Sequence, residues 1–398
     1  MNISATVCEY NPYHNGHKYL TDYAGQCGAD YFVGIMSGNV VQRGEFAIMD
    51  KYLRAQAAVT GGVDIIIELP CVYTLSEAER FAYGAVKTLD MCGCIDKLYF
   101  GAECDDIELL KKTAEYVSGI KVKDYIKSLS ENGYSHPRAM YNAVNDIYGK
   151  EYAQILSMPN NTLAIEYIKA LRDISSKIEP IAVKRKAVGH DDCTVKGEFA
   201  SASFIRQAIL SGDSSYQYYV PHAVSKIVDE SIKTGECPAC TGNNERGFLQ
   251  ALRRMSTEEW SNIPGVNEGL ENRIYKAVRE RQSFDKIMEG IKCKRYTYSR
   301  IRRTLMCAYL GITKKRLMTE PQYIRVLAAN MRGINVLREI TKKSLLPVIM
   351  SPARDINKIS GEGKKLFELE CKVSDMYTLF TPSITPCGKD YTRSARPV

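Results

Sequence analysis

The stretch ISATVCEYNPYHNGHKYL, residues 3–20, decides the fold because it leads a strand directly into a helix. Residues 3–10 are rich in β-branched and apolar side chains, as is typical of a strand, and a helical pattern follows over residues 16–28. Pro12 fixes the turn between the two, and Gly16 lets the backbone come close to a ligand. A helix that begins just after a strand presents its N–H groups and its dipole to phosphate. The stretch therefore predicts a phosphate-binding turn after the first strand of an α/β domain.

Strand and helix patterns alternate from here to about residue 212. Helical patterns lie at 51–60, 76–92 and 105–117, and further strands are expected at 31–37, 63–70, 95–103 and 179–187. The strand VDIIIELP, 63–70, is the most continuously apolar of these. Such alternation predicts an α/β fold with a parallel sheet covered by helices on both faces. In such sheets, ligands bind beyond the carboxyl ends of the strands.

The pattern changes after the polar break SGDSSYQ, 211–217. Apolar residues then recur mostly at helical spacing, and short strands are expected only at 346–351 and 377–380. The helical stretches lie at 221–233, 244–255, 269–280, 299–309 and 335–343. We therefore predict two domains, an α/β domain over 1–212 and a mainly helical domain over 213–398.

Composition predicts a cytoplasmic globular protein. The chain has 398 residues, of which 45% are hydrophobic and 25% are charged, and its net charge is +8. No apolar run is long enough to cross a membrane, and the first residues do not have the pattern of a secretory signal. The 13 cysteines are scattered, and the CxxC at Cys237 and Cys240 has no second pair at zinc-site spacing, so we expect reduced thiols and no metal site.

His14 and His17 stand three residues apart in a chain with only five histidines. A metal site would need a third nearby ligand, which the sequence does not offer. Surface histidines that cap a turn are a structural alternative. At a helix N-terminus after a strand, both side chains could instead donate to phosphate oxygens and stabilise the charge that builds up during transfer at an α-phosphate.

A second polar motif, ASASFIR, occupies 200–206. Ser201, Ser203 and Arg206 at the start of a helix are suited to holding a triphosphate. A capped helix without a ligand would look the same, but its pairing with HNGH in this strand and helix order favours the phosphate interpretation.

HNGH matches the HxGH signature of the nucleotidyltransferase superfamily, and SASFIR is similar to its second signature, ISSTxxR, with Ala202 in place of a Ser and Ser203 in place of the Thr. No KMSKS-like loop of the related aminoacyl-tRNA synthetases is visible. Further motifs follow in order: MSGNVVQRGEFA (36–47), DIIIELP (64–70), FGAE (100–103), PNN (159–161), KRKAVGHDD (184–192), KRYTYSRIRR (294–303) and YIRVL (323–327). Together they resemble the bacterial tRNA(Met) cytidine acetate ligase family.

The resemblance implies a Rossmann-like (HUP-type) nucleotidyltransferase domain and a reaction in two steps. ATP and acetate would form acetyl-adenylate, and the acetyl group would pass to N4 of the wobble cytidine of elongator tRNA(Met), with Mg²⁺ accompanying ATP and no coenzyme A. His14 and His17 are the catalytic candidates. The implied ATP site consists of Val7, Cys8, Glu9, Tyr10, Asn11, Pro12, Tyr13, His14, Asn15, Gly16, His17, Lys18, Tyr19, Leu20, Gly101, Asn160, Arg185, Lys186, Ser201, Ser203 and Arg206.

Several of these residues also have structural explanations. Asn160 offers both a donor and an acceptor to an adenine edge, but PNN would also make a good turn by itself. Arg185 and Lys186 could reach phosphate or form a solvated end of the strand. Gly101 ends a strand where a side chain would block a nucleotide. We also expect the loop 36–47 to lie beside the site, with Arg43 as a candidate partner for acetate or phosphate.

The segment KCKRYTYSRIRR, 292–303, is the candidate tRNA surface. Lys and Arg neutralise phosphates, and Tyr296 and Tyr298 could stack on unpaired bases. The predicted tRNA-binding residues are Lys294, Arg295, Arg300, Arg302 and Arg303. The alternative is a solvated helix face with tyrosine in the core. For the whole chain, the alternatives are a nucleotidyltransferase of cofactor biosynthesis and a non-catalytic tRNA-binding protein.

Overall fold

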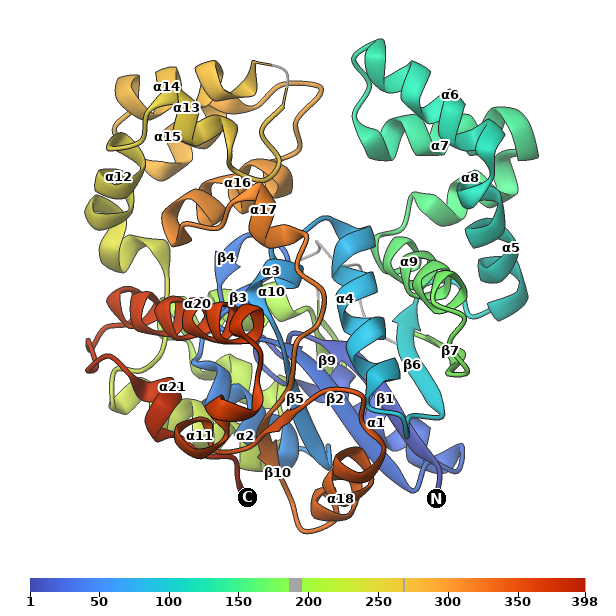
Figure 1. Cartoon of the computed structure of the whole chain (residues 1–398), viewed down its shortest axis with the longest axis vertical. Helices are drawn as coiled ribbons and strands as arrows, with labels where there is room; N and C mark the ends of the chain where they lie inside the picture. Colours follow the sequence, from blue (N-terminus) through green and yellow to red (C-terminus); the bar gives the residue numbers. More distant parts are fainter. Residues whose placement is uncertain (186–194, 268, 398) are drawn as a thin grey trace.

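Strand β1 (Ile3–Cys8) lies inside a mostly parallel sheet, as the opening stretch predicts. The computed structural model describes residues 1–185, 195–267 and 269–397, and the strand order is β11-β10-β5-β2-β1-β6-β7, with β12 paired to β10. The parallel neighbours of β1 continue the sheet on both sides: β2 (Tyr31–Ser37), β5 (Ile65–Leu69), β6 (Lys97–Ala102) and β7 (Glu179–Lys184). The predicted α/β, Rossmann-like fold is confirmed. Both chain ends lie at the lower end of the sheet in the view of Figure 1.

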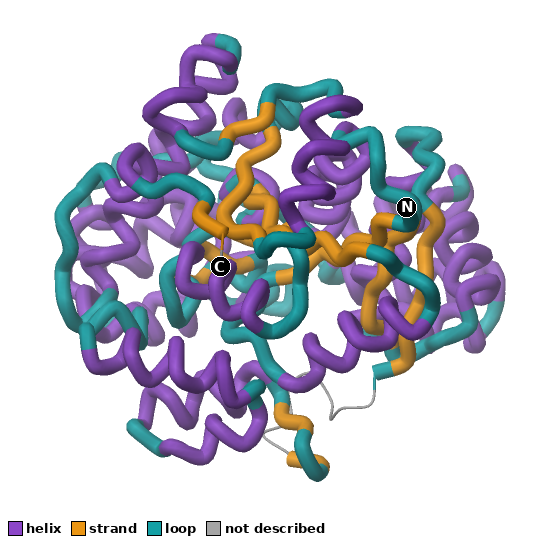
Figure 2. Tube along the Cα trace, turned by 90° about the horizontal axis from the view of Figure 1, so that it is seen from below, coloured by secondary structure: helices purple, strands orange, loops and turns teal. Residues whose placement is uncertain are grey.

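Helices cover both faces of the sheet because successive residues of a buried strand point to opposite faces. In β5, Ile65 and Ile67 belong to one hydrophobic core and Ile66 to the other. The helices that pack on these faces are α1 (Asn15–Gln26) and α2 (Lys51–Thr60) on one side and α4 (Ala78–Met91) and α9 (Pro159–Asp173) on the other. Figure 2 shows the strands enclosed between these helical layers.

The end of the chain returns to this sheet, which the sequence did not predict. Strand β10 (Ile324–Ala329) pairs antiparallel with β5, and both β11 (Val348–Ile349) and β12 (Arg396–Pro397) pair with β10. The strand expected at 346–351 is therefore confirmed, whereas the one expected at 377–380 is wrong, because residues Thr378–Phe380 form a 3₁₀ turn. The boundary after residue 212 stays a prediction.

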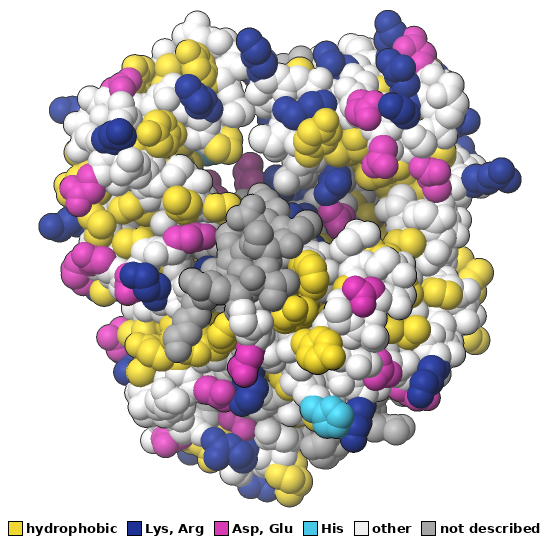
Figure 3. Space-filling model, turned by 180° about the vertical axis from the view of Figure 1, so that it is seen from behind, with side chains coloured by type: hydrophobic (Ala, Val, Ile, Leu, Met, Phe, Trp, Pro, Cys, Tyr) yellow, Lys and Arg dark blue, Asp and Glu magenta, His cyan; other side chains and the backbone are white. Residues whose placement is uncertain are grey.

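Two groups of helices rise beyond the sheet on opposite sides (Figure 1), and Figure 3 shows a hollow between them at the top of the rear face. The small lobe, residues 107–156, has a core of its own and consists of α5 (Ile107–Ser118), α6 (Ile120–Glu131), α7 (His136–Tyr148) and α8 (Lys150–Leu156). The basic lobe, residues 245–317, contains α12 (Glu245–Arg253), α13 (Thr257–Ser261), α14 (Leu270–Glu280), α15 (Phe284–Ile291), α16 (Tyr298–Leu310) and α17 (Lys314–Leu317). It holds 17 Lys and Arg against 8 Asp and Glu, a net charge of +9.

The remaining elements connect these parts. They are the hairpin strands β3 (Val40–Val41) and β4 (Glu45–Phe46), the hairpin strands β8 (Val195–Lys196) and β9 (Phe199–Ala200), and the helices α3 (Cys71–Thr74), α10 (Ala202–Ser211), α11 (His222–Lys233), α18 (Gly333–Lys343), α19 (Pro352–Asp355), α20 (Gly361–Tyr377) and α21 (Lys389–Thr392). Within the described ranges, no helix is both long and apolar enough to cross a membrane. Every cysteine that the structure describes is free.

Candidate functional site

A cavity of about 270 Å³ opens at the carboxyl ends of β1, β6 and β7. The chain proceeds outward from β1 on one side and returns to β6 on the other, so β1 and β6 border the switch point at which such sheets bind ligands. The predicted ATP-site residues that line the cavity are Val7, Cys8, Glu9, Tyr10, Asn11, His14, Gly16, His17, Tyr19, Leu20, Gly101, Asn160, Arg185, Ser201, Ser203 and Arg206. The structure therefore brings residues from five separate segments into one site.

Four predicted ATP-site residues lie elsewhere, namely Pro12, Tyr13, Asn15 and Lys18. The Tyr13 hydroxyl donates to the Gly61 carbonyl at 3.1 Å inside the core, and Lys18 forms an exposed ion pair with Asp22. The Asn15 amide donates to the carbonyl of Glu198 at 2.9 Å. These side chains shape the turn around the cavity rather than its wall, and Lys186 lies outside the described residues.

The two histidines are held by the first turn of α1. His14 is the N-cap, and its Nδ1 accepts from the Gly16 N–H at 3.1 Å, while Nδ1 of His17 accepts from the His14 N–H at 3.2 Å. The two rings stack with their centroids 3.7 Å apart. Because each Nδ1 accepts a hydrogen bond, the proton of each neutral ring is on Nε2. Each ring therefore keeps one N–H donor for a ligand in the cavity that it lines.

Both imidazoles are neutral at physiological pH. Burial, with smaller contributions from Arg185 and Arg206, lowers the pKa of His14 to about 3. Burial and the neighbouring His14 also lower the pKa of His17 well below its usual value. The pair thus supplies N–H donors without adding charge, and the cations that line the described part of the cavity are Arg43, Lys184, Arg185 and Arg206.

The second motif adds a second helix N-terminus to the cavity. Ser201 caps α10 by accepting from the Phe204 N–H at 3.1 Å. Arg206 donates to the Asn11 carbonyl at 3.0 Å and to Ser203 Oγ at 3.2 Å, so it ties α10 to the turn that follows β1. Two helix N-termini and an arginine around one cavity are suited to a polyanion such as a triphosphate.

Asn160 and Arg185 belong to a hydrogen-bonded group centred on Glu103. The Glu103 carboxylate accepts from Asn160 Nδ2 at 2.6 Å and from the Asn161 N–H at 2.9 Å, and Arg185 donates to Asn160 Oδ1 at 3.2 Å. PNN is the first turn of α9 rather than an isolated turn. A Cβ on Gly101 would lie 3.4 Å from Arg185 Cγ, so a larger side chain there would press on this wall.

The strands β3 and β4 form a hairpin that covers one side of the cavity, as expected for the loop 36–47. We call residues 40–46 the pocket hairpin; Val41, Gln42, Arg43 and Glu45 line the cavity. Its turn is fixed to the end of β1, because the Gln42 N–H donates to Glu9 Oε1 at 2.7 Å.

Arg54 of α2 also contacts the chain segment that follows β1. Its side chain is fully buried and donates to the carbonyls of Glu9, Ser37, Gly38 and Met49. The Glu9 carbonyl follows β1, and the carbonyls of Ser37 and Gly38 lie at the end of β2, so one guanidinium joins the ends of these two neighbouring strands. Neither Arg54 nor Glu103 was identified from the sequence, although an arginine among the alanines of an otherwise buried helix is a visible signal.

The predicted tRNA-binding residues begin α16 or lie just before it. Lys294 is exposed and Arg295 is partly buried. Arg300 donates to the Gly265 carbonyl at 2.8 Å, and Arg302 pairs with Glu45 of the pocket hairpin at 2.6 Å. Arg303 donates to the Gln42 carbonyl at 3.3 Å. Arg302 and Arg303 thus join the basic lobe to the pocket hairpin, and the tRNA contacts of this segment stay a prediction.

The alternative of a core tyrosine holds for one of the two tyrosines in this segment. Tyr296 is buried, with Arg300 over its ring at 4.9 Å, whereas Tyr298 is exposed. No group of three or more His, Cys, Asp or Glu side chains in the described parts of the chain is arranged to hold a metal ion.

Comparison with known proteins places this geometry in a family. The HIGH Nucleotidyl Transferase family matches residues 1–391, so the chain is a member of that nucleotidyltransferase class. Proteins described as tRNA(Met) cytidine acetate ligase are 39% identical in Thermoanaerobacter sp. (strain X514), over 98% of both chains, and 41% identical in Caldanaerobacter subterraneus subsp. tengcongensis, over 95% of both. Within the class, the chain belongs to the tRNA(Met) cytidine acetate ligase family.

Solved structures agree with this assignment. The apo structure (form I) of Thermotoga maritima TmcAL has a TM-score of 0.93 and 31% identity, and it covers 99% of both chains. A second structure of that protein (form II), bound with alpha-thio ATP, has a TM-score of 0.92 and 31% identity over 100% of both. A relative with the same fold therefore binds an ATP analogue.

Proposed function

We propose that this chain is an ATP-dependent tRNA(Met) cytidine acetate ligase of the cytoplasm. An acetate oxygen attacks the α-phosphorus of ATP, which forms acetyl-adenylate and releases pyrophosphate. The N4 amino group of the wobble cytidine of elongator tRNA(Met) then attacks the acetyl carbonyl, which forms N4-acetylcytidine and releases AMP and a proton. Coenzyme A takes no part in either step.

One observation carries the first step: the switch-point cavity gathers two neutral histidine donors, two helix N-termini and the partly buried Arg206. Negative charge grows on the α-phosphate and on the leaving pyrophosphate during adenylate formation. Donors that are already oriented toward this charge stabilise the transition state without reorganising. The apolar part of the wall, including Phe81, Phe100 and Tyr167, is suited to the flat face of adenine.

Mg²⁺ accompanies ATP in this proposal. Mg²⁺ in nucleotide sites is bound mainly by phosphate oxygens and water, with one or two carboxylates from the protein. Among the described residues of the cavity wall, Glu9 and Glu45 are the carboxylates, so these residues fit an ion that arrives with its nucleotide. The ion would neutralise triphosphate charge there.

Acetate is proposed to bind beside the pocket hairpin, with Arg43 as the partner of its carboxylate. Arg43 lines the cavity from the turn of the pocket hairpin. Arg43→Ala should reduce acetate-dependent ATP–pyrophosphate exchange, and exchange at the wild-type rate would remove Arg43 from this role.

The tRNA is proposed to lie over the hollow between the two lobes. The basic lobe carries a net charge of +9, more than the +8 of the whole chain, so the rest of the protein has no positive excess. Both lobes stand at the end of the sheet toward which β6 points (Figure 1), and Lys and Arg gather on the basic lobe at the right of Figure 3. Phosphates of an anticodon stem would be attracted to this lobe beside the adenylate.

Incubation with labelled acetate, ATP and bulk tRNA tests the proposal. Acid-stable label should enter tRNA when ATP is present, whether or not coenzyme A is added. Adenylyl transfer to a nicotinamide nucleotide without labelled tRNA would instead support a cofactor nucleotidyltransferase, and binding of tRNA without either reaction would indicate a non-catalytic protein.

A further inference from the structure

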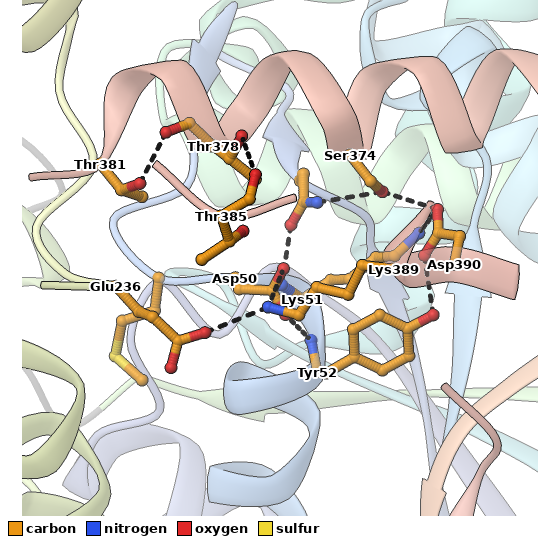
Figure 4. Close-up of polar contacts among 12 residues, drawn as sticks. Asp50, Lys51, Tyr52, Glu236, Ser374, Thr378, Thr381, Thr385, Lys389 and Asp390 are labelled. Carbon is orange, nitrogen blue, oxygen red and sulfur yellow. Dashed lines mark hydrogen bonds and ion pairs between the residues drawn. The ribbon is translucent and has the colours of Figure 1, made fainter. Parts of the chain in front are cut away.

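A buried polar network connects the end of the chain to the region of the cavity. At its centre is Asp390 of α21, which is 0% exposed. Its Oδ2 accepts from Ser374 Oγ at 2.7 Å and from Lys51 Nζ at 3.0 Å, and its Oδ1 accepts from the Tyr52 hydroxyl at 2.7 Å and from Arg325 Nη2 at 3.1 Å. Figure 4 shows Ser374 directed from α20 toward Asp390. Residues 361–397, which we call the carboxyl-terminal segment, therefore make specific contacts with α2 and β10.

Two cations and two carboxylates form the centre of this network. Lys51 and Arg325 face two carboxylates, since Glu68 pairs with Lys51 at 2.6 Å and with Arg325 at 3.1 Å in addition to their contacts with Asp390. All four side chains are at most 2% exposed. A buried charge that loses its partner is strongly destabilising, so this arrangement resists displacement. The Ser374 hydroxyl is thereby given a fixed direction.

Ser374 also makes a hydrogen bond with Asn39, the residue that immediately precedes β3. Asn39 Nδ2 donates to Ser374 Oγ at 3.2 Å, and Asn39 Oδ1 accepts from the Lys51 N–H at 2.7 Å. The Asn39 carbonyl accepts from the Ala47 N–H at 3.0 Å, across the base of the pocket hairpin. Asn39 is 1% exposed. One amide side chain thus fixes the hairpin base to both α20 and α2.

The pocket hairpin in turn completes the cavity through Gln42 and its contact with Glu9. Neither Asn39 nor Ser374 is among the described residues that line the cavity. An effect of Ser374 on a ligand is therefore indirect, and Asn39 is the residue through which Ser374 contacts the base of the hairpin.

We propose that Ser374 and Asp390 are positioning residues of the nucleotide site: acting through Asn39, they hold the pocket hairpin against the end of β1. The carboxyl-terminal segment is then part of the support of the ATP site, although it lies outside the predicted ATP-binding domain. The proposal rests on the proposed function of the cavity as the ATP site.

The test is ATP binding to the full chain, measured by calorimetry in the absence of acetate and tRNA. Ser374→Ala should raise the Kd for ATP roughly three- to tenfold, the effect expected when one buried hydrogen bond that orders a binding wall is lost. Ser225→Ala is the matched control: both serines are 4% exposed, and the Ser225 hydroxyl donates only to the His222 carbonyl within α11. The control should leave the Kd unchanged.

A double-mutant cycle separates this link from general destabilisation. Asn39→Ala should also weaken ATP binding, and in that background Ser374→Ala should add less than roughly a twofold further change, since the two residues share one connection. An equal loss in both backgrounds, or an unchanged Kd in Asn39→Ala, would overturn the proposal, as would an equal loss in Ser225→Ala. If the wild-type chain binds ATP but transfers no acetate, the proposed function fails while this test stands.

Discussion

The geometry of the histidine pair is determined within four residues. His14 caps the helix, His17 reaches back to the His14 N–H, and the rings stack. Gly16 is required between them because a Cβ at that position would lie 2.9 Å from His14 Cε1. All of these contacts are local, and this explains why the sequence HNGH alone could predict both the helix start and the donors.

We predict that His14→Ala lowers acetate-dependent ATP–pyrophosphate exchange by roughly a hundredfold or more, the usual cost of removing a preorganised transition-state donor. Binding of tRNA should be nearly unchanged, because His14 lies on the cavity wall and not on the basic lobe. His222→Ala, at an exposed position on α11, is the control and should exchange at the wild-type rate. Loss of tRNA affinity in His14→Ala would count against a role confined to the adenylate.

The low pKa of His14 has a consequence for stability. The unfolded chain takes up a proton on this residue below pH ~6.5, whereas the folded chain does so only near its pKa of about 3. The free energy of unfolding should therefore fall as the pH decreases from ~6.5 to 5, by at most about 2 kcal/mol for this group. Thermal melts at pH 7.5 and 5.0 should show a smaller decrease of Tm in His14→Ala than in wild type. Equal decreases would mean that His14 is protonated in the folded chain.

Residues whose partners are distant in sequence could not be identified in this way. Glu103 accepts from Asn160, and Asn39 donates to Ser374, which is 335 positions away. Each is an ordinary polar residue in its local context, and only the folded chain reveals that it is buried and engaged. The sequence accordingly predicted the residues of the cavity wall at the two helix N-termini and missed the residues that support them.

At the scale of elements, the pocket hairpin links the cavity to the basic lobe. Gly44, at its turn, has φ +80, and a Cβ there would lie 2.4 Å from the Arg303 backbone nitrogen. The Arg302–Glu45 ion pair adds a second contact between the hairpin and α16. The hairpin is thus held at its base by the carboxyl-terminal segment and at its tip by α16.

Gly44→Ala should therefore destabilise the protein by at least about 1 kcal/mol and weaken ATP binding, because both the positive φ and the close backbone oppose a side chain. Gly133→Ala is the matched control, since Gly133 has φ +87 with nothing within 4 Å of its Cβ. Melting temperature should decrease in both variants, and the Kd for ATP should rise only in Gly44→Ala. An equal rise in both would show that the contact with α16 has no part in binding.

The elements themselves were predicted where periodicity was clear and missed where it was not. The buried strand at 65–69 and the helix at 51–60 follow directly from their patterns. Strand β10 is a short apolar run beside helical patterns, and its place next to β5 depends on antiparallel pairing across more than half the chain. Local pattern does not carry that information.

At the scale of the whole molecule, the positive charge and the cavity meet at one end of the sheet. The basic lobe provides the charge, the switch point provides the cavity, and the pocket hairpin lies between them. Arg302 and Arg303 take part in this connection, so substitutions at these positions would disturb ATP binding together with any tRNA contact. The exposed lysines of the lobe are better probes of tRNA alone.

Reversing the charge at Lys294, Lys314 and Lys315 should weaken tRNA binding and flatten its salt dependence, with Kd for ATP unchanged. All three side chains are exposed on the basic lobe. Each phosphate contact adds about 0.7–0.9 to the slope of log K against log salt concentration, so the slope should decrease by roughly one to three in the triple Lys→Glu variant. A control with the same change in net charge reverses Lys226, Lys233 and Lys342, which are exposed on α11 and α18. This control variant should keep the wild-type slope if tRNA binds the basic lobe. Equal slopes in the two triple variants would instead mean that only the overall charge of the protein attracts tRNA.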